Sequence, residues 1–363
     1  MQNKKQIISN SILFIILIAI TFILIFKNHD FAKTINLILS VDIKYIILAI
    51  IAMSLNIVFE SINIKNVLES LGIKTELLKT IKYTLIGFFF SGITPAAGGG
   101  QPMEIYYMNK DKIPVASSTI SLLIELCSYH FITIILGIIG LIINYNIMTK
   151  EIIWIFIIGI TLKTIVLLFT IIALFSKRLS NLLVSILINI LEKIKYHNID
   201  KVKENVTILL TNYEQGSIYI KQHKNIFFKS LLLVSFQVIA YYSVTYFIYR
   251  SFGLNYYNLF KIISIQALLF VSVSSIPLPG SVGISESAFL KIYMTIFNIN
   301  ILPSAMLLSR GINFYLFILI SLVIVVLNSL RKNKNIWYNK NIIRRRIYEC
   351  WKKENKQCKI WQR

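Results

Sequence analysis

Long runs of apolar residues follow one another along most of the chain. The first, residues 7–26 (IISNSILFIILIAITFILIF), carries no charged residue. About 20 apolar residues are what an α-helix needs to span the hydrocarbon core of a bilayer. The pattern predicts six such spans, at residues 7–26, 43–64, 115–142, 152–175, 230–250 and 304–330. We therefore expect an all-α, polytopic membrane protein.

Two segments interrupt this pattern with proline and glycine. Residues 91–104 read SGITPAAGGGQPME, and residues 273–286 read VSSIPLPGSVGISE. The apolar arm before the first break, residues 83–93, rises only about 17 Å as a helix, which is short of a core of roughly 30 Å. We predict a re-entrant hairpin at 83–108, and a second broken hairpin or two short spans at 259–298. With the six spans this gives eight to ten membrane helices.

The two breaks match in their internal spacing. One constant offset along the chain relates Pro95 to Pro277, Gly98 to Gly280 and Glu104 to Glu286. The same offset carries the spans that flank the first break onto the spans that flank the second. We predict an inverted-topology repeat, which is typical of transporters. Its halves are residues 43–142 and 230–330, and an amphipathic linker at 176–229 joins them.

The charge of the chain is strongly positive but unevenly distributed. Lysine and arginine number 38 against 16 acidic residues, and the net charge is +22. Most of the basic residues lie at the N-terminus, at 65–82, at 109–112, in the linker and at 331–363. This asymmetry is the positive-inside pattern of integral proteins. It predicts a multi-pass protein of the bacterial plasma membrane with both termini in the cytoplasm.

The basic tail at 331–363 has its own expected partner. Its RRR run at 344–346, with lysine and tryptophan nearby, is expected to bind anionic lipids of the inner leaflet. Nucleic acid is a weaker explanation of this charge, and we predict no nucleic-acid partner. The segment at 66–80 is expected to form an amphipathic helix on the membrane surface.

Signatures of covalent or metal chemistry are weak. The three cysteines are scattered, without metal-ligand spacing or a disulfide framework. There is no H-E-x-x-H, no G-x-S-x-G and no phosphate-binding loop with lysine. We expect no metal, no cofactor and no enzyme activity. A Ser285–His130 pair in an intramembrane hydrolase is a minor alternative.

The broken segments hold the main candidate residues. Backbone groups released by proline and glycine cannot face lipid, so the loops at 94–102 and 276–284 are expected to line a cavity. The glycine run that precedes a helix would suit a phosphate, although tight hairpin packing is the alternative. Glu104 and Glu286 follow the breaks, and Arg310 is the predicted partner of Glu286.

Further acids lie on polar stripes of two spans. Glu60 belongs to a stripe with Asn56 and Asn63, and Glu125 to a stripe of serines. Both stripes predict that these acids face the cavity and not lipid. Lys163 lies in the middle of a span and needs a partner, for which Glu125 is the first candidate.

The motifs TPAAGGGQPME and PLPGSVGISESA, in a chain of this length, resemble the membrane domain of bacterial lysylphosphatidylglycerol synthase/flippase proteins. Free-standing flippase-like membrane proteins are similar. The resemblance covers about residues 7–330, the expected membrane domain (1–330). It implies movement of an anionic or aminoacylated phospholipid, or of an isoprenoid-phosphate lipid, between leaflets. It assigns headgroup contact to Pro95, Gly98, Gly99, Gly100, Glu104, Pro277, Pro279, Gly280, Gly283 and Glu286, to which the polar pattern adds Arg310, Glu60 and Glu125.

The full-length synthases of that family carry a soluble transferase domain. After residue 330 this chain has only the basic tail, so we do not expect a lysyltransferase label to apply to it. Two other functions stay open. The chain could supply lipid to a separately encoded synthase or glycosyltransferase, or it could be an ion-coupled carrier of small solutes. The sequence leaves the oligomeric state and the transported lipid undetermined.

Overall fold

The structure, a computed structural model, describes residues 31–176, 185, 199–274, 276 and 278–328. The predicted span at 7–26 and the basic tail lie outside these residues. In the described part all regular secondary structure is helical, and five of its helices are long and apolar enough to cross a membrane. They are α3 (Ile43–Ser70), α6 (Val115–Asn144), α7 (Lys150–Phe175), α10 (Lys224–Ser251) and the helix that begins as α13 (Leu302–Arg310) and runs to Asn328. These five match predicted spans.

Two broken elements lie between the long helices, also as predicted. The first consists of α4 (Leu77–Ile93), η1 (Pro95–Ala97) and α5 (Gly100–Lys110), and the second of α11 (Leu259–Val273), η3 (Pro279–Ser281) and α12 (Ile284–Ile292). The longest arm, α4, has 17 residues and so rises about 25 Å, less than the roughly 30 Å of a hydrocarbon core. Each element is therefore a broken hairpin and not a pair of full spans.

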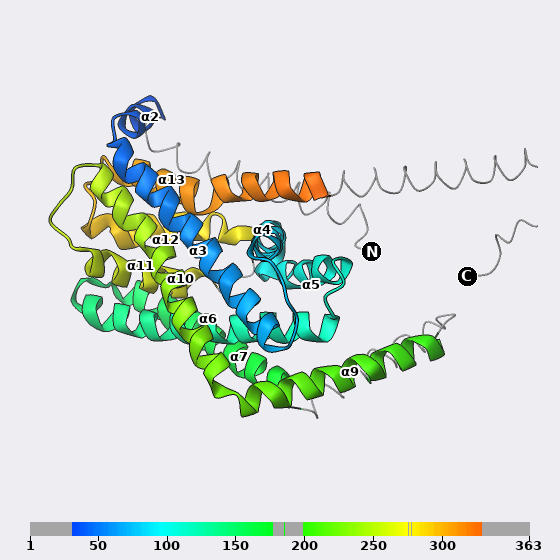
Figure 1. Cartoon of the computed structure of the whole chain (residues 1–363). Helices are drawn as coiled ribbons and strands as arrows, with labels where there is room; N and C mark the ends of the chain where they lie inside the picture. The colour runs from blue at the N-terminus through cyan, green and yellow to red at the C-terminus, as the bar shows by residue number, and fades with distance from the viewer. Residues whose placement is uncertain (1–30, 177–184, 186–198, 275, 277, 329–363) are drawn as a thin grey trace, which may run out of the picture.

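Two details differ from the sequence prediction. Residues 66–80 do not form a separate surface helix, because α3 continues to Ser70 and α4 begins at Leu77. Ahead of α3 the structure has the short helix α2 (Phe31–Leu39), which the sequence did not predict. In the linker, α9 (Ile199–Gln222) packs against α6 and α7 and extends along one side of the bundle (Figure 1).

The two halves have opposite orientation. α3 and α10, which the repeat relates to each other, run antiparallel at the centre of the bundle (Figure 1). At one end Asp42 N donates to Ser251 O at 2.9 Å, and further along Gln237 Nε2 donates to Glu60 Oε2 at 3.3 Å. Antiparallel packing of equivalent helices is the arrangement that a two-fold axis in the membrane plane produces. The packing of α3 against α10 is the one that the predicted inverted repeat requires.

Each hairpin packs against helices of the other half. A Cβ atom added at Gly92 of α4 would lie 2.5 Å from Ile318, in the last helix of the chain. In return, α11 lies against α6, where Asn144 Nδ2 donates to Ser264 Oγ at 2.9 Å. Small residues allow helix backbones to approach closely where no hydrophobic force drives association. The halves are thus interlocked and not merely adjacent.

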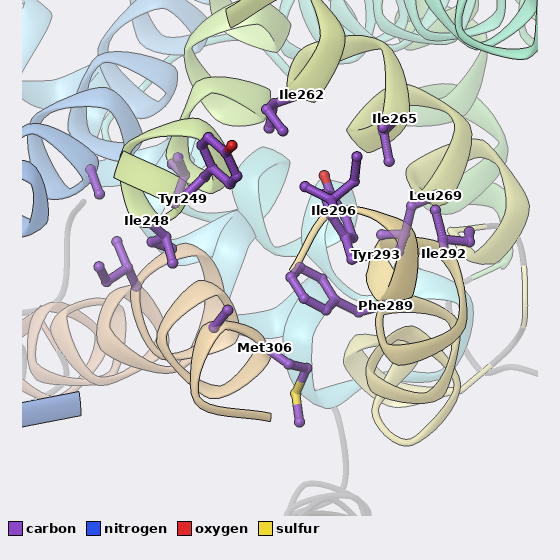
Figure 2. Packing of buried hydrophobic residues seen from close by; sticks show 14 of the residues in the cluster. Ile248, Tyr249, Ile262, Ile265, Leu269, Phe289, Ile292, Tyr293, Ile296 and Met306 are labelled. Carbon is purple, nitrogen blue, oxygen red and sulfur yellow. The ribbon is translucent and has the colours of Figure 1, made fainter. Parts of the chain in front are cut away.

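The two arms of the second hairpin, α11 and α12, pack together in an apolar and aromatic cluster (Figure 2). The ring of Phe289 stacks on that of Tyr293 at a centroid distance of 4.3 Å, and Tyr293 Oη donates to Gln266 Oε1 at 2.8 Å. The opposite, outward surfaces of α6 and α7 expose large apolar side chains such as Ile142, Trp154 and Ile158. An apolar exterior on helices long enough to cross a bilayer identifies a multi-pass membrane protein.

Candidate functional site

The tips of the two broken hairpins meet. η1 contacts η3, and α4 also contacts η3. Pro95 and Gly98 of the first tip are exposed, whereas Pro279 of the second is buried. Pro277 lies outside the described residues. The tips of the two hairpins therefore form one junction, which is exposed at the first tip and buried at the second.

The glycines of the first tip have different tasks. A Cβ atom at Gly100 would lie 2.0 Å from Ser91 Oγ and 2.9 Å from Gly87 O, so Gly100 allows α5 to approach α4. Gly99 is likewise buried, and its N–H donates to Thr94 Oγ1 at 2.9 Å. Only Gly98 is exposed, and a Cβ atom there would meet no atom closer than 3.5 Å. Tight hairpin packing, which the sequence left open as the alternative to phosphate binding, accounts for Gly99 and Gly100. Of the three glycines, Gly98 alone is accessible to a ligand.

This difference predicts unequal effects of the same substitution. Gly100→Ala is expected to lower the free energy of unfolding by about 1–3 kcal/mol, because the methyl group overpacks the hairpin. Gly98→Ala should leave it nearly unchanged. Thermal unfolding of both purified variants in one detergent checks this. Equal stabilities would show that the α4–α5 contact is not tight.

The second tip requires glycine for its backbone. Gly280 has φ +58° and Gly283 has φ +87°, a left-handed region that glycine adopts without strain. A Cβ atom at Gly280 would also lie 2.1 Å from the ring of Phe314. The N–H of Gly283 donates to Glu286 Oε2 at 2.7 Å. Glu286 therefore caps the helix that follows its own break.

Glu286 and Arg310 form the buried ion pair that the sequence predicts. Arg310 Nε donates to Glu286 Oε1 at 2.9 Å, with the two side chains 10% and 3% exposed. Arg310 Nη2 also donates to Gly280 O at 2.9 Å, and its guanidinium lies 4.4 Å from the centroid of the Phe314 ring. Arg310 thus ties the last helix to the turn and to the acid of the second tip. We name Gly280, Gly283, Glu286 and Arg310 the arginine unit.

A change of helix type accompanies the arginine unit. The last long helix is π-helical over Gly311–Leu316 (η5), directly after Arg310. Such segments are rare and occur mostly near functional positions. Here Tyr315 Oη donates to Glu286 Oε1 at 3.4 Å, and Ser285 Oγ donates to Glu286 Oε2 at 3.0 Å. The sequence did not predict these two contacts of Glu286, since regular helix spacing does not place Tyr315 on the face of Arg310.

The remaining predicted acids lie in the other half of the repeat. Gln237 Nε2 donates to Glu60 Oε2 at 3.3 Å and to Glu125 Oε1 at 3.4 Å, so one amide joins α3, α6 and α10. Glu104 of α5 lies against α4, where a Cβ atom added at Gly87 would be 1.8 Å from its Oε1 atom. One turn earlier in α4, Thr84 accepts a hydrogen bond from Ser61, the neighbour of Glu60, at 3.1 Å. Among the described residues the buried Oε2 atom of Glu104 has no hydrogen-bond partner. We name Glu60, Glu104 and Glu125 the acid cluster. Glu104 and Glu286, although equivalent in the repeat, have different partners.

Lys163 is not the partner of Glu125, and that prediction is wrong. Lys163 is 2% exposed, and Nζ lies 4.7 Å from the ring centroid of Phe270 and 5.7 Å from that of Tyr129. Among the described residues no carboxylate lies within ion-pair distance of it. The rotation of α7 points Lys163 at aromatic rings of α11 and α6, which stabilise a cation through their negative faces.

In the part of the chain that the structure describes, no three His, Cys, Asp or Glu side chains are grouped so as to hold a metal ion. The site therefore consists of a junction of two broken tips, a neutralised arginine unit and an acid cluster without a base. The long apolar helices and the junction of two broken tips define the class, a multi-pass membrane protein.

Comparison with known proteins assigns the chain to a family. The family model described as "Lysylphosphatidylglycerol synthase TM region" matches residues 10–321. The chain belongs to this family, which indicates a lipid-related role in the membrane. The comparison with curated proteins gave no match.

Proposed function

We propose that this chain moves a lipid with an anionic or phosphate-bearing headgroup between the leaflets of the bacterial plasma membrane. Lysylphosphatidylglycerol and polyprenyl-phosphate lipids are the candidate substrates, and no covalent chemistry is needed. The observation that carries the proposal is the junction of the two broken tips. A headgroup that passes there would meet protein while its acyl chains remain in lipid, and rocking of the interlocked halves would expose it to each side in turn.

The two tips offer a headgroup different surroundings. The N-terminus of α12 is capped by Glu286, which occupies the place of an anion. The N-terminus of α5 has no side-chain cap, and the exposed Gly98 lies beside it. Helix N-termini attract anions through free N–H groups and the helix dipole. We therefore assign the phosphate contact to the first tip and the structural closure of the junction to the second.

Gly98→Val tests this assignment. The larger side chain should block the headgroup and slow translocation by about tenfold, a barrier increase of about 1.4 kcal/mol. Thermal stability should hardly change, since Gly98 has open space. Protein in vesicles with a fluorescent phosphatidylglycerol or lysylphosphatidylglycerol, quenched from outside by an impermeant reductant, gives the rate. Gly98→Ala serves as the matched control and should fall between wild type and valine.

The proposal fails if Gly98→Val translocates every tested lipid at the wild-type rate. A protein that moves no lipid but co-purifies with a lipid-modifying enzyme would instead favour the role of a partner subunit.

A further inference from the structure

The acid cluster holds buried acceptors without enough donors. Glu104 is 5% exposed and Glu125 9%. From the residues that the structure describes, the cluster accepts hydrogen bonds only from Gln237 Nε2, to Glu60 and Glu125. Glu104 Oε2 and Gln237 Oε1 are buried and have no partner among the described residues. An ionised carboxylate inside a membrane is costly unless it is paired or hydrogen-bonded. The cluster therefore lacks either a cation or an O–H donor.

The described residues supply no such cation. Of the buried basic side chains, Arg310 binds Glu286 and Lys163 lies over aromatic rings. The half-buried Lys65 and Lys82 bind Glu69 and Asp111. Other titratable groups on the helices around the cluster include Tyr45 of α3, Tyr83 of α4, Tyr106 and Tyr107 of α5, Cys127, Tyr129 and His130 of α6, and Tyr241, Tyr242, Tyr246, Tyr249 and Arg250 of α10.

The second half of the molecule gives an internal comparison. There, Glu286 stands at the position of Glu104 and is neutralised by Arg310. The offset that relates Glu104 to Glu286 relates Ser128 to Arg310. Ser128 hydrogen-bonds Ser230 at 2.9 Å and carries no charge. The same architecture thus pairs its acid with a base in one half and leaves it without a base in the other.

A proton would meet the lack of a cation or O–H donor in the acid cluster better than a larger cation would. It converts a carboxylate into a carboxylic acid, which removes the charge and supplies the missing O–H donor at once. It needs no space, whereas a metal needs convergent ligands, and the described residues offer no such group. Glu60 is only partly buried and gives the cluster a contact with its surroundings. We propose that Glu60, Glu104 and Glu125 form a proton-binding site in which a protonated carboxyl group supplies the missing O–H donor.

Infrared spectroscopy of the full-length protein in vesicles tests the site without any transport assay. At neutral pH, wild type should show a carboxylic-acid C=O band that shifts on exchange into D₂O. Glu104→Gln should lose most of this band, and Glu125→Gln should reduce it. Glu286→Gln should leave it unchanged, because Glu286 lies outside the acid cluster and is paired with Arg310. Glu69→Gln, which alters an exposed ion pair, controls for the substitution itself.

Two results would overturn the proposal. If wild type lacks the carboxylic-acid band at neutral pH, the acids are ionised and held by a cation, such as the ammonium group of a lipid. A band that survives in both Glu104→Gln and Glu125→Gln would place the proton elsewhere. Each variant is first checked for a single symmetric peak in gel filtration, and Glu125→Gln provides an independent reading if Glu104→Gln does not fold.

The link from this site to transport rests on the proposed function and is measured separately. A pH gradient across vesicles should change the rate of lipid translocation several-fold with its direction in wild type, and not in Glu104→Gln. If the translocation rate does not depend on the pH gradient but the infrared band is present, the proton-binding site stands and its coupling to transport is rejected. Absence of any translocation would reject the proposed function and leave the infrared result standing.

Discussion

Arg310→Gln is expected to lower the free energy of unfolding by about 3–5 kcal/mol, the usual cost of leaving one member of a buried ion pair uncompensated. The variant loses the bond to Glu286 and the bond to Gly280 O together. The second tip then loses its attachment to the last helix, so lipid translocation should fall to background. Thermal unfolding in detergent and the vesicle assay measure the two effects.

The double variant Glu286→Gln/Arg310→Gln distinguishes the cost of an unpaired charge from the cost of losing the contact with Gly280 O. It removes both charges, so it should regain most of the lost stability, although the contact with Gly280 O stays broken. Lys65→Gln, at an exposed i,i+4 pair, should change stability by less than about 1 kcal/mol. If Arg310→Gln is no less stable than Lys65→Gln, the arginine unit does not hold the second tip.

Gly140→Ala is the second substitution with a large expected effect. A Cβ atom there would lie 2.3 Å from the carbonyl oxygen of Ser264. Backbone cannot move aside as a flexible side chain does, so α6 and α11 must separate. The hydrogen bond from Asn144 to Ser264 Oγ is strained by the same movement. We expect a loss of about 1–3 kcal/mol, as for overpacked cores.

Gly311→Ala is the control for this substitution, since a Cβ atom at Gly311 meets nothing within 4 Å. Its stability should be unchanged or slightly raised, because alanine favours helices. Thermal unfolding of both variants under one condition decides the matter. A Gly140→Ala protein as stable as Gly311→Ala would mean that the α6–α11 crossing is looser than the structure has it.

The architecture was largely predictable because its signals are local in sequence. Uncharged runs give the spans, and proline with glycine gives the breaks at 91–104 and 273–286. The constant offset between the breaks gives the inverted repeat. The pair Glu286–Arg310 was also predictable, since a buried acid and a buried base in one half have few other partners.

The roles of individual side chains were less predictable, because they depend on how each helix is rotated and how closely it crosses its neighbours. Gly99 and Gly100 allow hairpin packing where a phosphate contact was expected. Lys163 faces Phe270 and not Glu125. The π-helical segment shifts the register after Arg310, so that periodicity alone did not bring Tyr315 to Glu286. That Glu60, Glu104 and Glu125 participate as substrate contacts stays a prediction.

The interlocking of the halves has a consequence for biogenesis. α4, with Gly92, is synthesised well before Ile318, the side chain that it packs against in the finished protein. Synthesis proceeds from the N-terminus, so the first hairpin enters the membrane while its docking surface does not yet exist. Until then the polar backbone of its loop must be kept away from lipid, either by contact with the insertion machinery or by contact with water. The packing of the first hairpin is therefore completed only once the helix Leu302–Asn328 has been made.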